Sequence, residues 1–201
     1  EKHMRKHRES APDDSRTWFD EDLQLAYYMV EENSPVAGKS LKTLDFRQNY
    51  GCNVLQLSNP HRTVDMPGAE QIVTSNDTLL VIGTAAQLQI FDGAVKQRKL
   101  GVQQLQPPQS LRQFMLASHM QKPEQQFLSL AITIDKHSPL LGTSMKDAQL
   151  RNKWSCLVIG LERGAFTITN PHVSLTFEEN DLLWILGKQK MMNTLIREEI
   201  L

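Results

Sequence analysis

One segment of this sequence is written twice. A shift of 104 residues aligns residues 34–83 with residues 138–187 without a gap, and fifteen of the fifty aligned positions are identical. Among the identical pairs are Gly38 and Gly142, and many of the differences exchange one apolar residue for another, which two cores of similar volume tolerate. The duplication predicts two lobes with the same fold, and a chain of 201 residues has room for two such lobes.

Each copy predicts a small α+β unit in the order strand, short helix, several strands, helix. The β-rich runs 25–30 and 127–134 favour opening strands, and Ser40 and Ser144 are typical helix N-caps. The apolar runs that end at Gly83 and Gly187 are continuous, which predicts strands covered on both faces. The remaining expected elements are a short helix that ends at Gly51, strands over 52–57 and 156–161, short strands near Thr63 and Thr167, and closing helices over 85–99 and 188–200.

The copies divide the chain into four expected parts. These are a connector over residues 1–24, a first lobe over 25–93, a helical linker over 94–126 and a second lobe over 127–201. The linker contains an amphipathic segment, 110–120, that predicts one helix. Residues 1–8 carry four Lys or Arg, which is typical of a juxtamembrane segment and also of a basic tail. We expect Met191, Leu195 and Ile200 of the last helix to contact another lobe.

The composition excludes several classes of protein. A net charge of -1 argues against a nucleic-acid binder, which needs a basic surplus. The two cysteines, Cys52 and Cys156, are too few for a disulfide scaffold and are expected to be buried core residues in a reducing compartment. No zinc signature occurs, and no G-x-S-x-G elbow or dinucleotide-binding G-x-G-x-x-G. The sequence therefore predicts neither a catalytic site nor a metal site.

The repeated motifs resemble a known family. These are Ser-Pro-x-x-Gly-x-Ser at residues 34–40 and 138–144, an Arg at 47 and 151, a Pro at 67 and 171, and Asn-Asp followed by an apolar run to Gly at 76–83 and 180–187. Together they resemble the RCK-C domain, also called TrkA-C, over about 140 residues in both copies. The resemblance implies two tandem RCK-C lobes, each a small, mostly antiparallel sheet with short helices.

The resemblance also implies a function. RCK-C lobes regulate cation channels and transporters from the cytoplasm, dimerise and bind small effectors. Tandem copies without the nucleotide-binding RCK-N domain are similar to the C-terminal tails of bacterial monovalent cation:proton antiporters. The expected partners are a transmembrane transport domain of the same protein at the inner membrane, a second copy of the chain and a small nucleotide, but no nucleic acid.

Some RCK-C lobes bind cyclic di-AMP through an Arg at the end of the short helix and an Asn six residues later. Copy one matches at Arg47 and Asn53, with Phe46 beside them and Pro67 on the facing loop. Copy two keeps Arg151 and Pro171, but Leu157 stands where the Asn is expected. The cyclic dinucleotide is thus the possible effector, and no cofactor is certain. A structural role stays open, because Arg47 and Arg151 are also suited to pairing with a carboxylate or capping a helix, and Asn53 to a turn or strand edge.

Two other functions fit the same residues. Paired RCK-C lobes also resemble those inserted in some anion and amino-acid exchangers. A second alternative is an oligomerisation module that binds no ligand.

Overall fold

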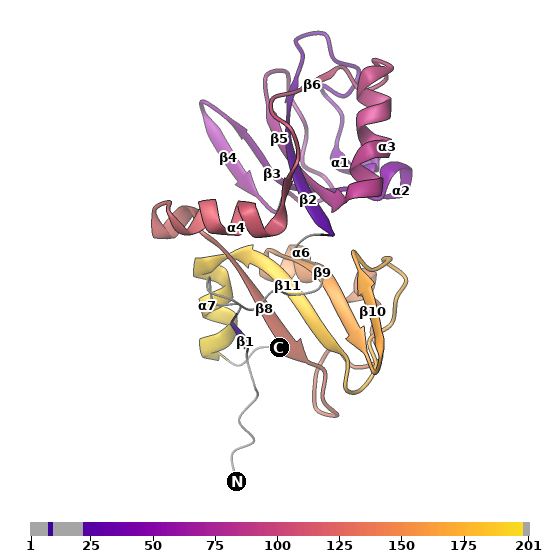
Figure 1. The fold of residues 1–201 in the computed structure, drawn as a ribbon, viewed down its shortest axis with the longest axis vertical. Helices are drawn as coiled ribbons and strands as arrows, with labels where there is room; N and C mark the ends of the chain where they lie inside the picture. Colours follow the sequence, from indigo (N-terminus) through magenta and orange to yellow (C-terminus); the bar gives the residue numbers. More distant parts are fainter. Residues whose placement is uncertain (1–7, 10–21, 199–201) are drawn as a thin grey trace. The chain divides into compact units, whose positions relative to one another are not determined.

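The computed structural model describes residues 8–9 and 22–198. The chain forms two compact units, residues 20–114 and residues 115–201 together with 1–19. The N-terminal connector thus lies largely outside the described residues, as does Ile200. Each unit holds one antiparallel sheet with short helices (Figure 1), which confirms the predicted α+β class and the two tandem lobes.

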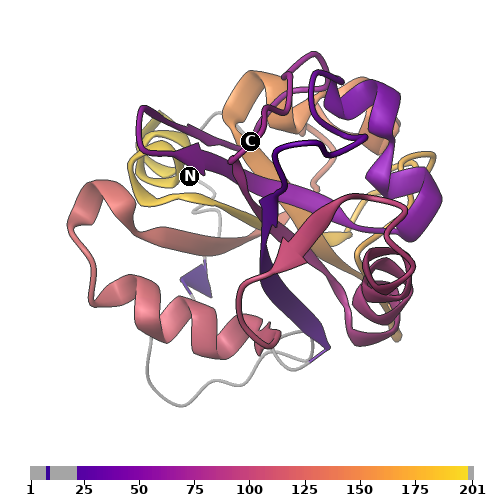
Figure 2. The same ribbon diagram turned by 90° about the horizontal axis from the view of Figure 1, so that it is seen from above.

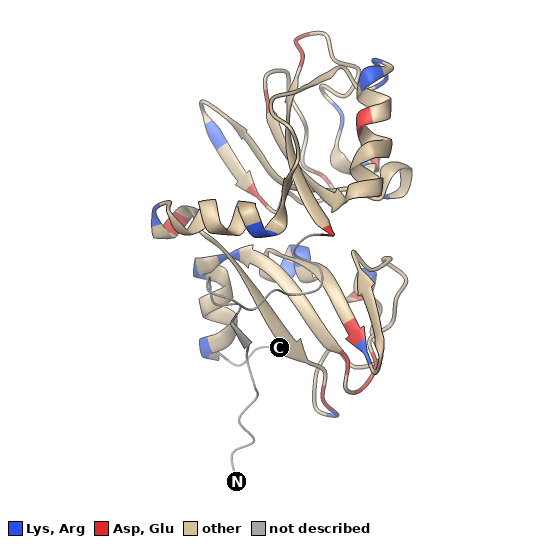
Figure 3. Ribbon diagram, in the orientation of Figure 1, with Lys and Arg blue, Asp and Glu red and all other residues tan. Residues whose placement is uncertain are grey.

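The first lobe is built on a sheet with the strand order β4-β3-β5-β2-β6, and β7 also pairs with β2. The central strands β2 and β5 carry no charged residue, and charges lie mostly at strand ends and in loops (Figure 3). The strands are β2 (Leu23–Val30), β3 (Asn53–Asn59), β4 (Arg62–Asp65), β5 (Thr78–Thr84), β6 (Val102–Gln104) and β7 (Gln109–Ser110).

Three helices lie on one side of this sheet (Figures 1 and 2): α1 (Leu41–Leu44), α2 (Phe46–Tyr50) and α3 (Ala85–Lys96). Thr84 begins α3 with a capping box, in which its hydroxyl accepts from the Gln87 N–H and the Gln87 side chain accepts from the Thr84 N–H. The helix buries Leu88 and Phe91 against the sheet. It ends at Lys96, earlier than the predicted 99, because Arg98 adopts a left-handed φ of 56°.

The second lobe repeats this plan with the sheet order β1-β8-β11-β9-β10. Its core contains Met192 and Leu195 of the last helix, and Met191 packs against it. The expectation of a lobe-to-lobe contact is therefore wrong for Leu195, because its side chain, 3% exposed, lies in the core of its own lobe; for Met191 that contact stays a prediction. The elements are β1 (Arg8–Glu9), β8 (Phe127–Thr133), α5 (Met145–Ala148), α6 (Leu150–Trp154), β9 (Cys156–Arg163), β10 (Phe166–Thr169), β11 (Leu182–Lys188) and α7 (Gln189–Glu198).

The single short helix predicted between Ser40 and Gly51 is two helices. Asp45 takes a left-handed φ of 40° between α1 and α2, and its carboxylate accepts a hydrogen bond from the Gln48 N–H at 3.2 Å. Gln149 has a φ of 51° at the same place in the second lobe. A residue with left-handed backbone angles ends the hydrogen bonding of a helix, so in each lobe the chain changes direction at this residue. Ser40 and Ser144 are N-caps, as predicted, and Gly51 ends α2.

The segment predicted as a helical linker contains α4 (Leu111–His119), a 3-10 helix, η1 (Pro123–Gln125), and the strands β6 and β7. The two strands complete the first sheet at its β2 edge: Met29 pairs with Gln103, and Leu25 pairs with Gln109. Periodicity did not predict these strands, because they are short and Gln-rich.

Both faces of each sheet are apolar. In the first lobe, Ala26, Tyr28 and Val81 face the helices, whereas Leu25 and Ile82, which pair directly, face the other way. Leu25 and Ile82 are nevertheless 0% and 1% exposed. The prediction that the apolar run before Gly83 is covered on both faces is confirmed.

Candidate functional site

The candidate site begins with a contact between α2 and β3. Arg47 lies on α2, and Gly51 reverses the chain after that helix with a φ of 72°, a conformation that glycine adopts without strain. The reversal returns the chain to Asn53, the first residue of β3, and Arg47 Nη1 donates a hydrogen bond to Asn53 Oδ1 at 3.0 Å. The spacing of six residues therefore brings the guanidinium and the amide together, as the resemblance implies.

Asn53 is a buried polar residue, 6% exposed, on an otherwise apolar row of the sheet. It pairs with Ile82, which pairs with Leu25 on the next strand, so the three side chains share the face that points away from the helices. Burial lowers the pKa of Arg47, although a guanidinium stays charged in this range. A charge held in such surroundings interacts more strongly with an anion than one in bulk water.

Pro67 lies beside the beginning of β3. The Met66 N–H donates to Leu55 O at 2.8 Å, so the chain that leaves β4 passes along the first residues of β3, and Pro67 is buried there. Phe46 lies elsewhere. It is 4% exposed in the core, with its ring edge-on to Phe91 at 5.4 Å between centroids. The structure thus brings Arg47, Asn53 and Pro67 to one end of β3 and places Phe46 behind them.

The second lobe has the same backbone with different chemistry. The Asn170 N–H donates to Ile159 O at 3.0 Å, which places the buried Pro171 beside β9. Arg151 lies on α6, and Leu157, 5% exposed, takes the place of the amide. This lobe therefore keeps the cation and the proline without the polar group that meets them in the first lobe.

A buried carboxylate holds the turn before the last strand of the first lobe. Asp77, 0% exposed, accepts hydrogen bonds from the Thr74 N–H at 2.8 Å, from Asn59 Nδ2 at 2.7 Å and from Arg62 Nη2 at 2.9 Å. Burial by itself would raise the pKa of Asp77, but these bonds outweigh it and lower the pKa. The carboxylate is therefore a structural anchor of the turn.

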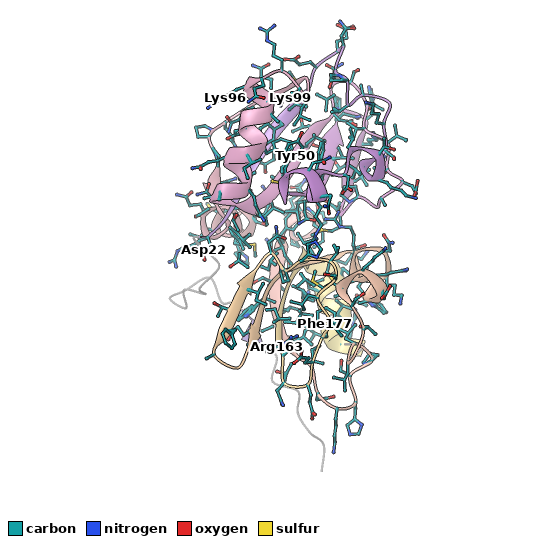
Figure 4. All side chains as sticks on the ribbon, turned by 90° about the vertical axis from the view of Figure 1, so that its right-hand side faces the viewer. Asp22, Tyr50, Lys96, Lys99, Arg163 and Phe177 are labelled. Atoms are coloured by element: carbon teal, nitrogen blue, oxygen red, sulfur yellow. The ribbon has the colours of Figure 1, made fainter. Side chains whose placement is uncertain are left out.

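In the second lobe the anchor is Asp181, also 0% exposed. Arg163 donates from Nε to one carboxylate oxygen and from Nη2 to the other, both at 2.7 Å, and the Glu178 N–H donates at 2.8 Å. Arg163 and Phe177 are labelled in Figure 4. Comparison of the two sequence copies identifies both aspartates, because they align. It does not identify the arginines that bind them, because Arg62 and Arg163 occupy different positions in the two copies.

Both cysteines are free and buried, as predicted. Burial, with a smaller contribution from the charge of Asp92, raises the pKa of Cys52 to about 12. Burial also raises the pKa of Cys156 to about 12, although the charge of Arg151 opposes it.

Residues 8–9 and 22–198 contain no cluster of three or more His, Cys, Asp or Glu side chains suited to a metal ion. In the same part of the chain, no helix combines the length and the apolar character that crossing a bilayer requires.

The family model for the TrkA-C domain matches residues 25–92 and 130–199, once for each lobe and over more than half of the chain. The chain belongs to the TrkA-C family. This domain is a regulatory part of transport-associated proteins. The tandem arrangement that the repeat predicts is therefore confirmed.

Two curated relatives show the range of proteins that carry this domain. The K(+)/H(+) antiporter subunit KhtT of Bacillus subtilis is 35% identical over 69 residues, which are 33% of this chain and 41% of the relative. The uncharacterized transporter YfbS of Escherichia coli is 22% identical over 173 residues, which are 84% of this chain and 26% of the relative. The chain spans less than half of the length of the curated relatives that it matches.

Among solved structures, the RCK_C domain dimer of S. agalactiae BusR in complex with c-di-AMP is 16% identical, with a TM-score of 0.33. The match covers 36% of this chain and 96% of the BusR domain.

Proposed function

We propose that this chain is the effector-sensing and dimerising module of a membrane cation:proton antiporter that carries K+ or Na+, placed at the cytoplasmic face of a bacterial inner membrane. The Arg47–Asn53 hydrogen bond at the start of β3 carries the proposal. A guanidinium and an amide on an apolar sheet face suit a ligand with a phosphate and a base, because Arg binds phosphate and an amide binds a base edge. Cyclic di-AMP, the effector implied by the resemblance, has both groups.

Regulation then follows from differential binding. An effector shifts the equilibrium between two arrangements of the lobes only by the difference in its affinity for them, typically about 1–3 kcal/mol. The attached transport domain responds to that shift. KhtT, named as an antiporter subunit, is a relative that supports an antiporter as the partner.

In this proposal, one half of the binding site consists of Arg47, Asn53 and Pro67 of the first lobe. A two-fold symmetric dinucleotide needs the same groups twice, and Leu157 deprives the second lobe of the amide. Two first lobes from two copies of the chain therefore form the full site, whereas Arg151 and Pro171 mark its incomplete counterpart in the second lobe.

Calorimetry with cyclic di-AMP tests the proposal. Arg47→Ala should weaken binding by at least roughly tenfold, because a hydrogen bond between charged groups contributes about 1.5–3 kcal/mol. Arg151→Ala is the matched control at the same repeat position and should change the affinity less than about threefold. Absence of binding to the unmodified chain below about 1 mM cyclic di-AMP would refute the effector-sensing function and favour the ligand-free oligomerisation module.

A transporter of another class is the second candidate, since the match to YfbS, whose class of transport is not stated in its name, extends over both lobes. In this case the lobes regulate an anion or amino-acid exchanger. Ion-flux measurements with the complete protein separate the two: proton-coupled K+ or Na+ exchange supports the first candidate, and its absence together with anion exchange supports the second.

A further inference from the structure

The strand β10 forms one edge of the second sheet (Figure 1), and within residues 8–9 and 22–198 it pairs only with β9. The Asn170 N–H, just after β10, donates to Ile159 O of β9 at 3.0 Å. Because backbone direction alternates along a strand, Ile168 faces β9 in the same way, whereas Thr167 and Thr169 direct their N–H and C=O groups to the outer edge. Two residues of β10 therefore offer backbone groups to a further strand.

The equivalent edge of the first lobe carries charges. The strand β4 is the repeat equivalent of β10 and reads Arg-Thr-Val-Asp, with a charge at each end (Figure 3). Arg62 donates to Ile72 O at 3.2 Å and to Asp77 at 2.9 Å, and Asp65 accepts from Gln56 Nε2 at 2.7 Å. Charged side chains are a common means of protecting an edge strand from pairing with another chain, so the first lobe is protected here.

The strand β10 lacks this protection. It reads Phe-Thr-Ile-Thr, with no charge and no proline. Phe166 takes the place of Arg62 and is 75% exposed, whereas Ile168 packs against the core of its own lobe. An uncharged edge of aromatic and β-branched residues is a template for strand pairing, and aromatic side chains are enriched at protein interfaces.

We propose that the outer edge of β10 is a dimerisation surface whose occupant is β10 of a second copy of the chain. Antiparallel pairing of a strand with its own copy is two-fold symmetric and therefore forms a closed dimer. Thr167 and Thr169 flank Ile168 symmetrically. A two-fold axis at Ile168 thus sets Thr167 opposite Thr169 of the second copy, where the two residues exchange both backbone hydrogen bonds and their side chains form a favourable cross-strand pair.

The same register gives the exposed ring of Phe166 a partner. Side chains alternate along a strand, so Phe166 and Ile168 share one face of β10 and the two threonines share the other. On the first face, Ile168 lies opposite Ile168 of the second copy, and Phe166 lies diagonal to it at a distance that an aromatic side chain spans. The pairing therefore covers Phe166 and joins two five-stranded sheets into one.

The inference rests on the dimerisation proposed above and names the surface responsible for it. The experiments below use no effector and no transport measurement. Their failure would leave the effector site at Arg47 untouched, and failure of cyclic di-AMP to bind would leave the pairing of β10 untouched.

Hydrogen exchange of the full chain, measured over about a hundredfold range of protein concentration, tests the pairing. The Thr167 and Thr169 amides should exchange at least about tenfold more slowly at the highest concentration than at the lowest, because the second copy supplies their acceptors. The Ile168 amide, which faces β9, should exchange at a rate independent of concentration. The Thr63 amide is the matched control at the edge of β4, and it should exchange rapidly at every concentration.

Proline substitution tests the same contact by sedimentation equilibrium. Thr167→Pro removes an N–H that points out of the lobe, a place where edge strands tolerate proline, and it should raise the dissociation constant of the dimer at least about tenfold. Thr63→Pro makes the same change at the equivalent position of the first lobe and should alter this constant less than about threefold. Phe166→Arg keeps the backbone intact and copies the first lobe, and it should also weaken the dimer.

Three outcomes would overturn the proposal. The first is an unmodified chain that stays monomeric over the whole concentration range. The second is a dimer whose dissociation constant is the same in the unmodified chain, in Thr167→Pro and in Phe166→Arg. The third is a monomer in which the Thr167 and Thr169 amides are nevertheless protected, because another segment of the same chain would then occupy the edge.

Discussion

The hydroxyl of Tyr28 donates a hydrogen bond to a carboxylate oxygen of Asp92, joining β2 to α3 in the first lobe. Burial is the main cause that raises the pKa of Tyr28, and the bond to Asp92 raises it further. At the equivalent repeat positions the second lobe has Ile132 and Ile196. The two positions therefore change together, from a hydrogen-bonded polar pair to an apolar pair.

Removing the hydroxyl should destabilise the first lobe. Tyr28→Phe leaves the Asp92 carboxylate without this donor, and we expect the free energy of unfolding to fall by about 1–2 kcal/mol in urea denaturation. Tyr27→Phe is the matched control, because no hydrogen bond of the Tyr27 hydroxyl is found among the described residues, and it should change stability by less than about 0.5 kcal/mol. A double-mutant cycle with Asp92→Ala measures the coupling, and strictly additive losses would contradict a direct bond.

The stability of the first lobe should depend on the ionisation of Asp77. Its pKa is lowered in the folded state, so its contribution is fully present above the unfolded pKa of about 3.9 and is lost as the pH falls through the folded pKa. Unfolding measured from pH 7 to pH 2 should show a progressive loss below about pH 4. Asp77→Asn removes the charge and should flatten this part of the profile; an unchanged profile would assign the acid sensitivity to other groups.

In the second lobe, Arg163 alone donates to both oxygens of Asp181, whereas in the first lobe Asn59 and Arg62 share the donation to Asp77. Position 59 of the first lobe is Asn and position 163 of the second is Arg, whereas Arg62 corresponds to Phe166. Arg62→Ala should lower the free energy of unfolding by about 2–4 kcal/mol, because it leaves the buried Asp77 without its cation. The double change Asn59→Arg with Arg62→Phe copies the second lobe and should recover most of this loss. No recovery would show that the two turns are not interchangeable.

Both thiols should be unreactive in the folded protein. A thiol with a pKa of about 12 has almost no thiolate at pH 8, and both cysteines are 1% exposed. Titration with a thiol reagent should therefore detect neither Cys52 nor Cys156 before urea is added and both of them afterwards. Rapid modification of either cysteine in the native protein would contradict the burial of both.

Asn53→Leu separates binding from stability at the candidate site, because it places the residue of the second lobe in the first. Its neighbour across the sheet is Ile82, so a leucine should fit this apolar row; the substitution also removes the acceptor of the Arg47 hydrogen bond, so the melting temperature should fall by only a few degrees. Affinity for cyclic di-AMP should fall at least roughly tenfold in calorimetry. A large drop in melting temperature with unchanged affinity would assign Asn53 a structural role.

The residues of the candidate site were predictable only through the resemblance to the RCK-C domain. Arg47 and Asn53 are six residues apart, and Gly51 between them supplies the reversal that brings their side chains together. The links between distant segments were not predictable. Tyr28 and Asp92 are 64 residues apart, and the arginines that hold Asp77 and Asp181 come from different repeat positions, so no local pattern reveals either link.

The amino-acid sequence by itself determined the duplication, the α+β class, the capping serines and the doubly covered strands, because these depend on periodicity and on residues near one another in the chain. The tertiary structure alone decided which segments complete the sheets, since backbone pairing is nearly independent of side-chain identity. The short Gln-rich strands β6 and β7 close one sheet, and Arg8 of the N-terminal segment closes the other opposite Ala131.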